Sequence, residues 1–329
     1  MRFADSTRQL KGSGKALWGL CALLCLSFTA GVAHAAGPLQ VSIVYEGSRS
    51  THRAVVAAIQ ENTSNSCQEL VCAPIEWTLL DMQGGAQEQT LAGADLVVAL
   101  GATSQQIRTL AASESAAVLY GLISAADWET LQSCCGEIHP SQSAIFTDQP
   151  LARSLALTRA LLPKARHAGV LLGNRSGRQL GQISETAAQI GLVPVFARVE
   201  EAGQVGSKMR SLQQEVDVWL GIPDRDIYNR NTLYGILLTA YAARQALIGY
   251  SRPLVRAGAA AAVYSSADDV AYGLAGHIRA YANSGELPPA SYPENFSIEL
   301  NPQVLRSLKI AVPPSDRLRQ QVQALRPQD

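Results

Sequence analysis

The chain carries a set of small polar and aromatic residues that each follow a short apolar run. Their side chains can donate or accept hydrogen bonds and stack on a ring, which is what a pocket for a small ligand requires. They match no spacing that is typical of a nucleophile, a metal site or a general base. The candidate ligand contacts are Tyr45, Glu46, Thr103, Ser104, Ser124, Asn174, Asp224, Tyr264, Ser265 and Ser266.

The sequence lacks the motifs of common hydrolases. It contains neither the GxSxG turn of a serine nucleophile nor the HExxH helix of a zinc protease. The histidines after residue 35 stand singly, at His52, His139, His167 and His277. We therefore expect no catalytic residue, no cofactor and no metal, so that the chain is not an enzyme. An enzyme with an unrecognised acid–base pair is the alternative.

Glycine recurs at every fourth position of the segment HAGVLLGNRSGRQLGQI, residues 167–183. This spacing matches neither the dinucleotide fingerprint GxGxxG nor the phosphate loop GxxxxGK[ST]. We expect a helix to begin near Ser176, so the N–H groups of the turn from Asn174 to Gly177 are placed to hold a ligand carboxylate. For Gly177 and Gly181 we expect a structural role, because glycines four apart lie on one helical face and permit close packing against a sheet.

Composition indicates a globular, exported chain. Of 329 residues, 47% are hydrophobic and 16% are charged, with 27 basic and 27 acidic side chains, so no nucleic-acid-binding surface is indicated. Basic residues precede an apolar run over 16–32, and Ala33-His34-Ala35 fits a signal-peptidase site. We predict a signal peptide over 1–35, cleaved after Ala35, and a mature protein in the periplasm. An uncleaved membrane anchor is the alternative.

The cysteines after the predicted signal are even in number, and an oxidising compartment favours disulfides. They are Cys67, Cys72, Cys134 and Cys135. In a sheet of order 2-1-3-4-5 the strands after Cys72 and Cys135 lie on opposite edges, roughly 19 Å apart, which is too far for a bridge. We predict a Cys67–Cys72 disulfide, with Cys134 and Cys135 joined to each other or free. The alternative is a metal site in CCGEIH, formed by Cys134, Cys135, Glu137 and His139.

The chain after residue 39 repeats one unit: a short apolar run, a turn, then a segment with helical spacing. This alternation predicts βαβ units and parallel sheets covered by helices on both faces. The predicted strands span 39–46, 75–81, 95–101, 117–123, 143–147, 167–173, 192–198, 216–222 and 259–265. Helical spacing is clear over 151–162 and 180–190. A break at 148–150 divides the units into two series, which predicts two Rossmann-like, doubly wound lobes with strand order 2-1-3-4-5.

Several long segments carry a family likeness. They are ALTRALLPKARHAGVLLGNRSG, AAQIGLVPVFARV, DVWLGIPDRDIYN, RAGAAAAVYSSADDVAYGLAGHIRAYANSGELP and IELNPQVLRSLKIAVPPS. The chain resembles the periplasmic substrate-binding proteins of ABC transporters, in the group that includes tryptophan-binding and other aromatic-amino-acid-binding members. The likeness extends to Pro314 and is strongest after Leu151.

The resemblance implies a type I periplasmic binding fold with two lobes, three crossings and a cleft that closes on ligand. The crossings fall at 147–150, 264–267 and 292–296. Lobe 1 comprises 37–147 and 268–291, lobe 2 comprises 148–267 and 292–322, and 323–329 form a tail. By the same likeness, the ten strand-end residues named above contact the ligand. One departure is clear, because Tyr264-Ser265-Ser266 stands where relatives have a turn with an acidic residue.

The same resemblance implies a function. The chain is expected to be a monomeric solute-binding component of an ABC-type uptake system, which passes its ligand to a permease in the inner membrane. The solute is a small metabolite such as an amino acid or a related carboxylate, and Glu46 or Asp224 is expected to pair with its amine. The alternative is a periplasmic sensor whose closed form docks on a signalling receptor or an outer-membrane uptake system.

Overall fold

The structure is a computed structural model that describes residues 37–66, 74–82, 91, 93–101, 116–134, 141–174 and 176–324. The predicted signal peptide, Thr103, Ser104, Cys67, Cys72 and Cys135 lie outside these ranges, as do Glu137 and His139 of the alternative metal site. Cys134 ends a described helix, but its side chain is not described. The disulfide pairing and the export signal therefore remain predictions.

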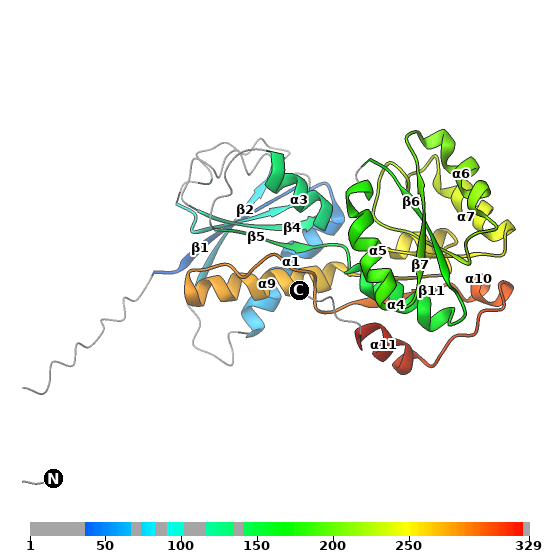
Figure 1. The fold of residues 1–329 in the computed structure, drawn as a ribbon. Helices are drawn as coiled ribbons and strands as arrows, with labels where there is room; N and C mark the ends of the chain where they lie inside the picture. Colours follow the sequence, from blue (N-terminus) through cyan, green and yellow to red (C-terminus); the bar gives the residue numbers. More distant parts are fainter. Residues whose placement is uncertain are drawn as a thin grey trace, which may run out of the picture. The chain divides into compact units, whose positions relative to one another are not determined.

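The first sheet has five parallel strands in the order β2-β1-β3-β4-β5 (Figure 1). Its strands are β1 (Leu39–Tyr45), β2 (Ile75–Asp81), β3 (Leu96–Leu100), β4 (Ala117–Ile123) and β5 (Gln142–Phe146). The central strand β3 is buried throughout, whereas the edge strand β2 alternates between exposed and half-buried residues. This contrast explains why the sequence of β3 is continuously apolar, since a central parallel strand is covered on both faces.

Helices from distant parts of the chain cover the first sheet. One face packs against α1 (Ser50–Ser66) and α9 (Ala267–Ser284), and the other packs against α3 (Ala125–Cys134). Small residues permit the close approach of α9. A side chain at Gly273 would lie 3.1 Å from Ile145 of β5, and one at Gly121 of β4 would lie 2.7 Å from Leu274 of α9. The helix that closes this sheet therefore comes from the far end of the chain.

The second sheet has six strands in the order β11-β10-β9-β8-β6-β7. Its strands are β6 (His167–Leu172), β7 (Val193–Arg198), β8 (Val218–Leu220), β9 (Ala246–Gly249), β10 (Ala261–Tyr264) and β11 (Ser297–Leu300). All pairs are parallel except the pair of β10 with β11, which is antiparallel. The predicted order 2-1-3-4-5 is thus confirmed in both sheets, and the second gains one antiparallel edge strand.

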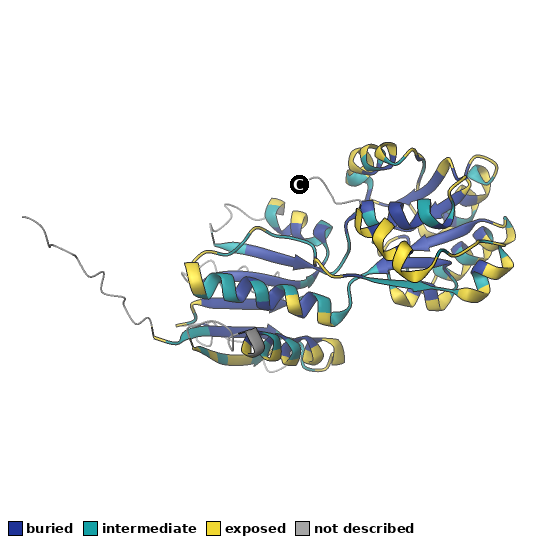
Figure 2. Ribbon diagram, turned by 90° about the horizontal axis from the view of Figure 1, so that it is seen from below, coloured by how far each residue is buried: buried dark blue, intermediate teal, exposed yellow. Residues whose placement is uncertain are grey.

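The second sheet is also covered on both faces. One apolar cluster includes buried residues of α4 (Leu151–Leu161), α5 (Leu180–Gln189), α10 (Pro302–Ser307) and α11 (Ser315–Ala324). The other includes those of α6 (Val205–Leu212), α7 (Leu233–Ala242) and α8 (Arg252–Ala257). Figure 2 shows the strands mostly buried and the outward helix faces exposed. Helix α11 continues to Ala324, into the predicted tail.

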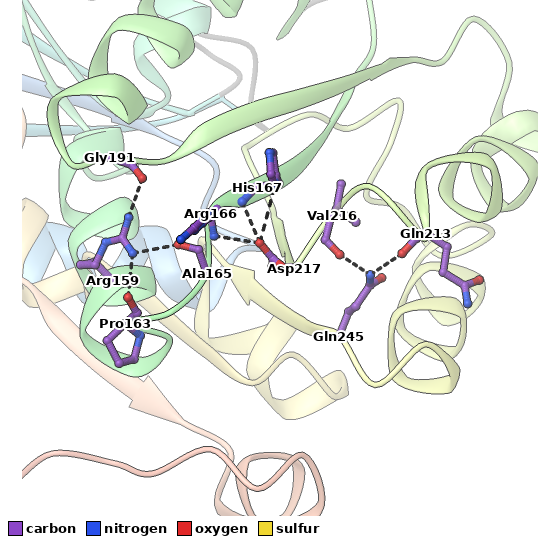
Figure 3. A network of polar contacts seen from close by, with 10 residues as sticks. All are labelled: Arg159, Pro163, Ala165, Arg166, His167, Gly191, Gln213, Val216, Asp217 and Gln245. Carbon is purple, nitrogen blue, oxygen red and sulfur yellow. Dashed lines mark hydrogen bonds and ion pairs between the residues drawn. The ribbon is translucent and has the colours of Figure 1, made fainter.

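Two polar side chains, the half-buried Arg159 and the buried Gln245, fix the amino-terminal end of the second sheet (Figure 3). The Arg159 guanidinium donates to the carbonyls of Pro163 and Ala165, which follow α4, and to those of Ile190 and Gly191, which follow α5. A cation there also faces the negative ends of both helix dipoles. The Gln245 amide donates to the carbonyls of Gln213 and Val216. It also accepts from the Trp219 indole N–H at 2.8 Å.

The chain passes between the two sheets three times. It leaves the first sheet after β5, returns after β10 to form α9, and leaves again to form β11. We call these passages the first, second and third crossings and give them the limits that the resemblance implies (147–150, 264–267 and 292–296). In the described part of the chain, no helix combines the length and the apolar character that crossing a bilayer requires.

Candidate functional site

A pocket of about 50 Å³ lies where the crossings meet the ends of several strands. Its volume suits several water molecules or one group of a ligand. It is lined by Ala126, Asp148, Gln149, Leu151, Ser154, Gln179, Gln182, Ile183, Gly221, Ile222, Pro223, Tyr250, Val263 and Tyr292. We call it the hinge pocket. The lining combines apolar contacts, two tyrosine rings, three glutamine amides and one carboxylate, which is typical of a small-molecule site.

The carboxylate of the hinge pocket belongs to Asp148, which follows β5. Its Oδ1 accepts a hydrogen bond of 3.0 Å from the N–H of Ala125, the first residue of α3. A register shift between β4 and β5 turns the chain just before this contact, and Leu122 adopts a positive φ of 55° within it. Such strained positions persist where the surroundings determine them, and they cluster at functional sites. Just after this irregular part of β4, the first residue of α3 contacts Asp148.

The electrostatics around Asp148 disfavour its ionised form. Burial is the largest cause that raises its pKa to about 6, and the charges of Asp127 and Glu129 act in the same direction. The hydrogen bond from Ala125 opposes this change but does not cancel it. Because no cation offsets burial and the two neighbouring acids, the carboxylate titrates closer to neutral pH than an ordinary aspartate.

Two tyrosines of the hinge pocket are held by neighbouring rings. Tyr292, at the start of the third crossing, packs edge-on against Phe146 of β5 with ring centroids 5.0 Å apart. Tyr250, after β9, packs edge-on against Tyr228 at 5.6 Å. Burial raises the pKa of Tyr250 to about 12, and burial followed by the charge of Asp148 raises the pKa of Tyr292. Both hydroxyls are therefore neutral donors at physiological pH.

Gln149 connects all three crossings. Its amide nitrogen donates to the hydroxyl of Ser265 in the second crossing at 2.7 Å and to the carbonyl of Asn295 in the third at 3.3 Å. Its carbonyl oxygen accepts from Arg153, which also donates to the carbonyls of Pro293 and Glu294. The crossings are thus joined by the side chains of Arg153, in the first turn of α4, and of Gln149, two residues before that helix.

The glycine-rich turn after β6 holds a carboxylate of the protein itself. The Asp224 Oδ2 accepts from the backbone N–H of Ser176 at 3.2 Å and from its hydroxyl at 2.6 Å, and the Gly177 N–H donates to the carbonyl of Gly173. The expectation that these N–H groups hold a ligand carboxylate is therefore wrong for Ser176 and Gly177. Asp224 is buried, and its Oδ1 accepts from the N–H of Asp226. Its contacts are structural.

Two further predicted contacts are helix caps. Ser124 accepts from the N–H of Asp127 at 3.1 Å and donates to its carboxylate at 2.8 Å, so it caps α3. Ser266 makes the equivalent pair with Asp269 at the start of α9, which is a capping box. A serine three residues before an acidic residue is the sequence signal for this arrangement, and the strand-end pattern obscured it.

The remaining predicted contacts lie at strand ends in varied surroundings. Tyr45 packs partly against the core of the first sheet, and Glu46 forms an ion pair of 2.5 Å with Arg49. Asn174 is exposed, Tyr264 is half-buried, and Ser265 accepts from Gln149. None of the eight predicted residues within the described ranges lines the hinge pocket, although their chain neighbours Ala126, Pro223 and Val263 do.

The glycines of the opening segment have separate roles. A side chain at Gly169 would lie 2.7 Å from the Trp219 ring, and one at Gly173 would lie 2.7 Å from the Asp224 carboxylate. At Gly181 nothing lies within 4 Å, so the expectation that Gly181 packs closely against the sheet is wrong. A short 3-10 helix over Ser176–Gln179 precedes α5, which places Gly181 on an exposed surface.

The described histidines make local contacts. The Nδ1 of His52 accepts from the Glu46 N–H at 3.2 Å, His277 Nε2 lies 3.1 Å from the Pro289 carbonyl, and His167 pairs with Asp217 at 3.7 Å. Within the ranges that the structure covers, no three His, Cys, Asp or Glu side chains are grouped as metal ligands.

Comparison with solved structures shows the fold. A substrate-binding protein with adhesive properties from Clostridium difficile, in a ligand-free open structure, matches with a TM-score of 0.66 and 16% identity over 84% of this chain and 97% of its own. An ABC domain in complex with L-Trp from Streptococcus pneumonia matches with a TM-score of 0.56 and 15% identity, over 85% and 97% of the two chains. A periplasmic ribose ABC transporter from Conexibacter woesei matches with a TM-score of 0.51 and 12% identity, over 84% and 96%.

No family model and no curated protein matches the sequence. The structural matches nevertheless span at least 96% of each solved chain and 84–85% of this one. The chain therefore has the type I periplasmic substrate-binding protein fold, with two parallel-sheet lobes.

Proposed function

We propose that this chain is an exported solute-binding protein of an ABC-type uptake system. It captures a small metabolite between its two lobes and presents the closed form to a permease. The observation that carries this proposal is the hinge pocket, whose lining combines the first and third crossings with the ends of β8, β9 and β10. The fold shared with substrate-binding proteins supports it.

Closure of the lobes requires only that the ligand binds the closed form better than the open form. A shift from 1:99 to 99:1 requires about 5.5 kcal/mol of differential binding. Hydrogen bonds from Gln149, Gln179 and Gln182, together with contact to the tyrosine rings, are of the kind that supplies such an energy. Because Gln179 and Gln182 follow β6 and Tyr292 follows α9, one ligand group in the pocket contacts elements of both sheets.

Other contacts in the proposed site lie at the strand ends. We keep Tyr45, Glu46, Asn174 and Tyr264 as residues that meet the rest of the solute when the lobes close. Thr103 and Ser104 belong to the same proposal from the sequence alone. The proposal also includes the export signal, the permease partner and lobe limits at 147/148, 267/268 and 291/292.

The proposal is tested by identifying small molecules that copurify with the protein. The full chain is expressed in a Gram-negative host, the exported protein is purified without dialysis, and compounds released by heating are analysed by mass spectrometry. We expect one chemically unaltered metabolite at near-stoichiometric amount. The same compound, added to protein that has been unfolded and refolded without it, should raise the melting temperature.

A pocket-filling variant provides the control. Ala126→Trp places a large ring in the hinge pocket from α3, whereas Ala188→Trp places the same ring on the exposed face of α5. The metabolite should be lost from Ala126→Trp and retained by Ala188→Trp. Equal retention by both variants would count against the pocket, and a metabolite recovered in altered form would favour an enzyme.

A further inference from the structure

The charge of the hinge pocket is unusual. Among its lining residues, all of which the structure describes, Asp148 is the single acid, and there is no lysine, arginine or histidine. The nearby Arg153 does not compensate this charge. Its guanidinium donates to the carbonyls of Pro293 and Glu294 and lies over the Phe296 ring, 4.6 Å from its centroid. The lining of the hinge pocket therefore contains a carboxylate and no side-chain counterion.

The Asp148 carboxylate and the Tyr292 ring are both held near the end of β5. Asp148 is held by the Ala125 N–H, which donates to Oδ1, and by its own backbone N–H, so both bonds to its carboxylate come from uncharged backbone groups. Tyr292 is fixed because Ser291 pairs with β5, donating to the Ala144 carbonyl at 2.9 Å and accepting from the Phe146 N–H at 3.1 Å. A pocket that combines an oriented carboxylate with aromatic rings is suited to a cation.

The residues next to the hinge pocket add further negative charge around Asp148. Asp127 and Glu129 of α3 both disfavour ionisation of Asp148, and the Tyr292 hydroxyl is neutral. A bound cation would remove the cost of holding this carboxylate ionised, whereas a bound anion would increase that cost. A metal ion is less well suited, because Asp148 is the only carboxylate that lines the pocket, and Mg²⁺ and Ca²⁺ require several oxygen ligands.

We propose that the hinge pocket binds a protonated amine of the solute, with the Asp148 carboxylate as its counterion and the Tyr250 and Tyr292 rings beside it. The amides of Gln149, Gln179 and Gln182 orient the part of the solute next to the amine. This proposal rests on the proposed solute-binding function and specifies its ligand as an organic ammonium compound. Asp148 acts in binding, and no covalent step is involved.

The test compares amines with partners that lack the amine. Purified full-length chain, freed of copurified ligand, is titrated by calorimetry and thermal shift with the twenty standard amino acids, tryptamine, putrescine, indole-3-propionate, phenyllactate and D-ribose. We expect at least one amine to bind and its counterpart without the amine to bind far more weakly. Asp148→Asn keeps an acceptor for the Ala125 N–H but removes the charge, and it should weaken the amine about 10- to 100-fold.

Two controls separate binding from folding. Asp316→Asn removes one exposed carboxylate from α11, outside the pocket, and should leave amine affinity within about twofold. The wild-type affinity for the amine should also fall as pH is lowered from 7.5 to 5, because Asp148 becomes protonated, and Asp148→Asn should show no such dependence.

Three results would overturn the inference. The first is that no amine in the set binds, the second is that the counterparts without an amine bind equally well, and the third is that Asp148→Asn binds an amine like the wild type. Binding of D-ribose or of an anion alone would overturn the amine site and leave the solute-binding function standing. Failure of the whole set, together with no copurified metabolite, would count against the proposed function as well.

Discussion

The amide nitrogen of Gln149 lies 2.7 Å from the hydroxyl oxygen of Ser265, and this hydrogen bond joins the first crossing to the second. The same amide donates to the carbonyl of Asn295 in the third crossing. One side chain thus connects all the segments that any movement between the lobes must bend. Gln149 also lines the hinge pocket, so the residue that connects the crossings is placed to contact the ligand.

Replacing Gln149 by alanine should lower the free energy of unfolding. The change removes the bonds to Ser265, Asn295 and Arg153, and we expect a loss of about 1–3 kcal/mol. Chemical denaturation followed by circular dichroism measures it. Gln303→Ala, an exposed glutamine of α10, is the matched control and should change stability by less than about 0.5 kcal/mol. Equal midpoints for the two variants would show that the crossings are not held by Gln149.

Replacing Gly173 or Gly181 by alanine should have opposite effects on the stability of the protein. A methyl group at Gly173 meets the Asp224 carboxylate, which cannot move away without losing its bonds to Ser176, so Gly173→Ala should cost about 1–3 kcal/mol. Gly181→Ala lies in a helix with open space around it and should stabilise by about 0.5–1 kcal/mol. Thermal denaturation of both variants checks the signs. Similar effects of the two changes would contradict the role assigned to Asp224.

Arginine at position 159 should not be replaceable by lysine. Its guanidinium bonds to four carbonyls after α4 and α5, and a lysine ammonium can reach only some of them. Arg159→Lys should therefore lower the free energy of unfolding by about 1–2 kcal/mol. The control is Arg256→Lys, an exposed residue of α8, which should be nearly neutral. If the two lysine variants had equal free energies of unfolding, the carbonyl contacts of Arg159 would contribute little to stability.

The stability of the unliganded protein should depend on pH through Asp148. Burial raises its pKa from 3.8 to about 6, so between these values the folded state binds a proton that the unfolded state has lost. Stability from this group is therefore greatest below about pH 4 and falls as pH rises to about 6, by up to about 3 kcal/mol. The free energy of unfolding of Asp148→Asn should equal that of the wild type near pH 4 and exceed it above pH 6.

Unfolding of both proteins at several pH values gives this difference directly. Subtracting the two curves removes the contributions of all other titrating groups. A difference that stayed constant between pH 4 and pH 7.5 would show that Asp148 keeps an ordinary pKa. A stabilising Asn variant that also loses amine affinity would identify Asp148 as a residue retained for binding at a cost in stability.

Periodicity in the sequence predicted most of the fold, because short apolar runs separated by helical segments fit only a few architectures. Two strands, β2 and β4, have the predicted limits. Strand β9 was missed because the chain passes from α7 to β9 without a glycine. Arg244 ends the helix with a positive φ of 55°, a conformation that glycine usually adopts, so the usual stop signal is absent.

The candidate site was harder to predict, because several strand-end residues serve the fold. Ser124 and Ser266 begin helices, and Asp224 fills the turn after β6. Asp148 follows β5 as directly as the predicted residues follow their strands, but the sequence suggested only a break between lobes there. Tyr292 reaches the site because its segment pairs with β5, a contact between residues far apart that no local pattern reveals.

The return of α9 to the first sheet has a consequence for biosynthesis. A chain that is available only as far as β10 has every strand of that sheet but lacks α9, which shares one face of the sheet with α1. The apolar surface formed by Val41, Val98 and Leu119 then lacks its contacts with α9, which lies more than 100 residues later in the chain. Such an intermediate exposes a surface that chaperones bind, so the protein should depend on them until its last third is available for folding.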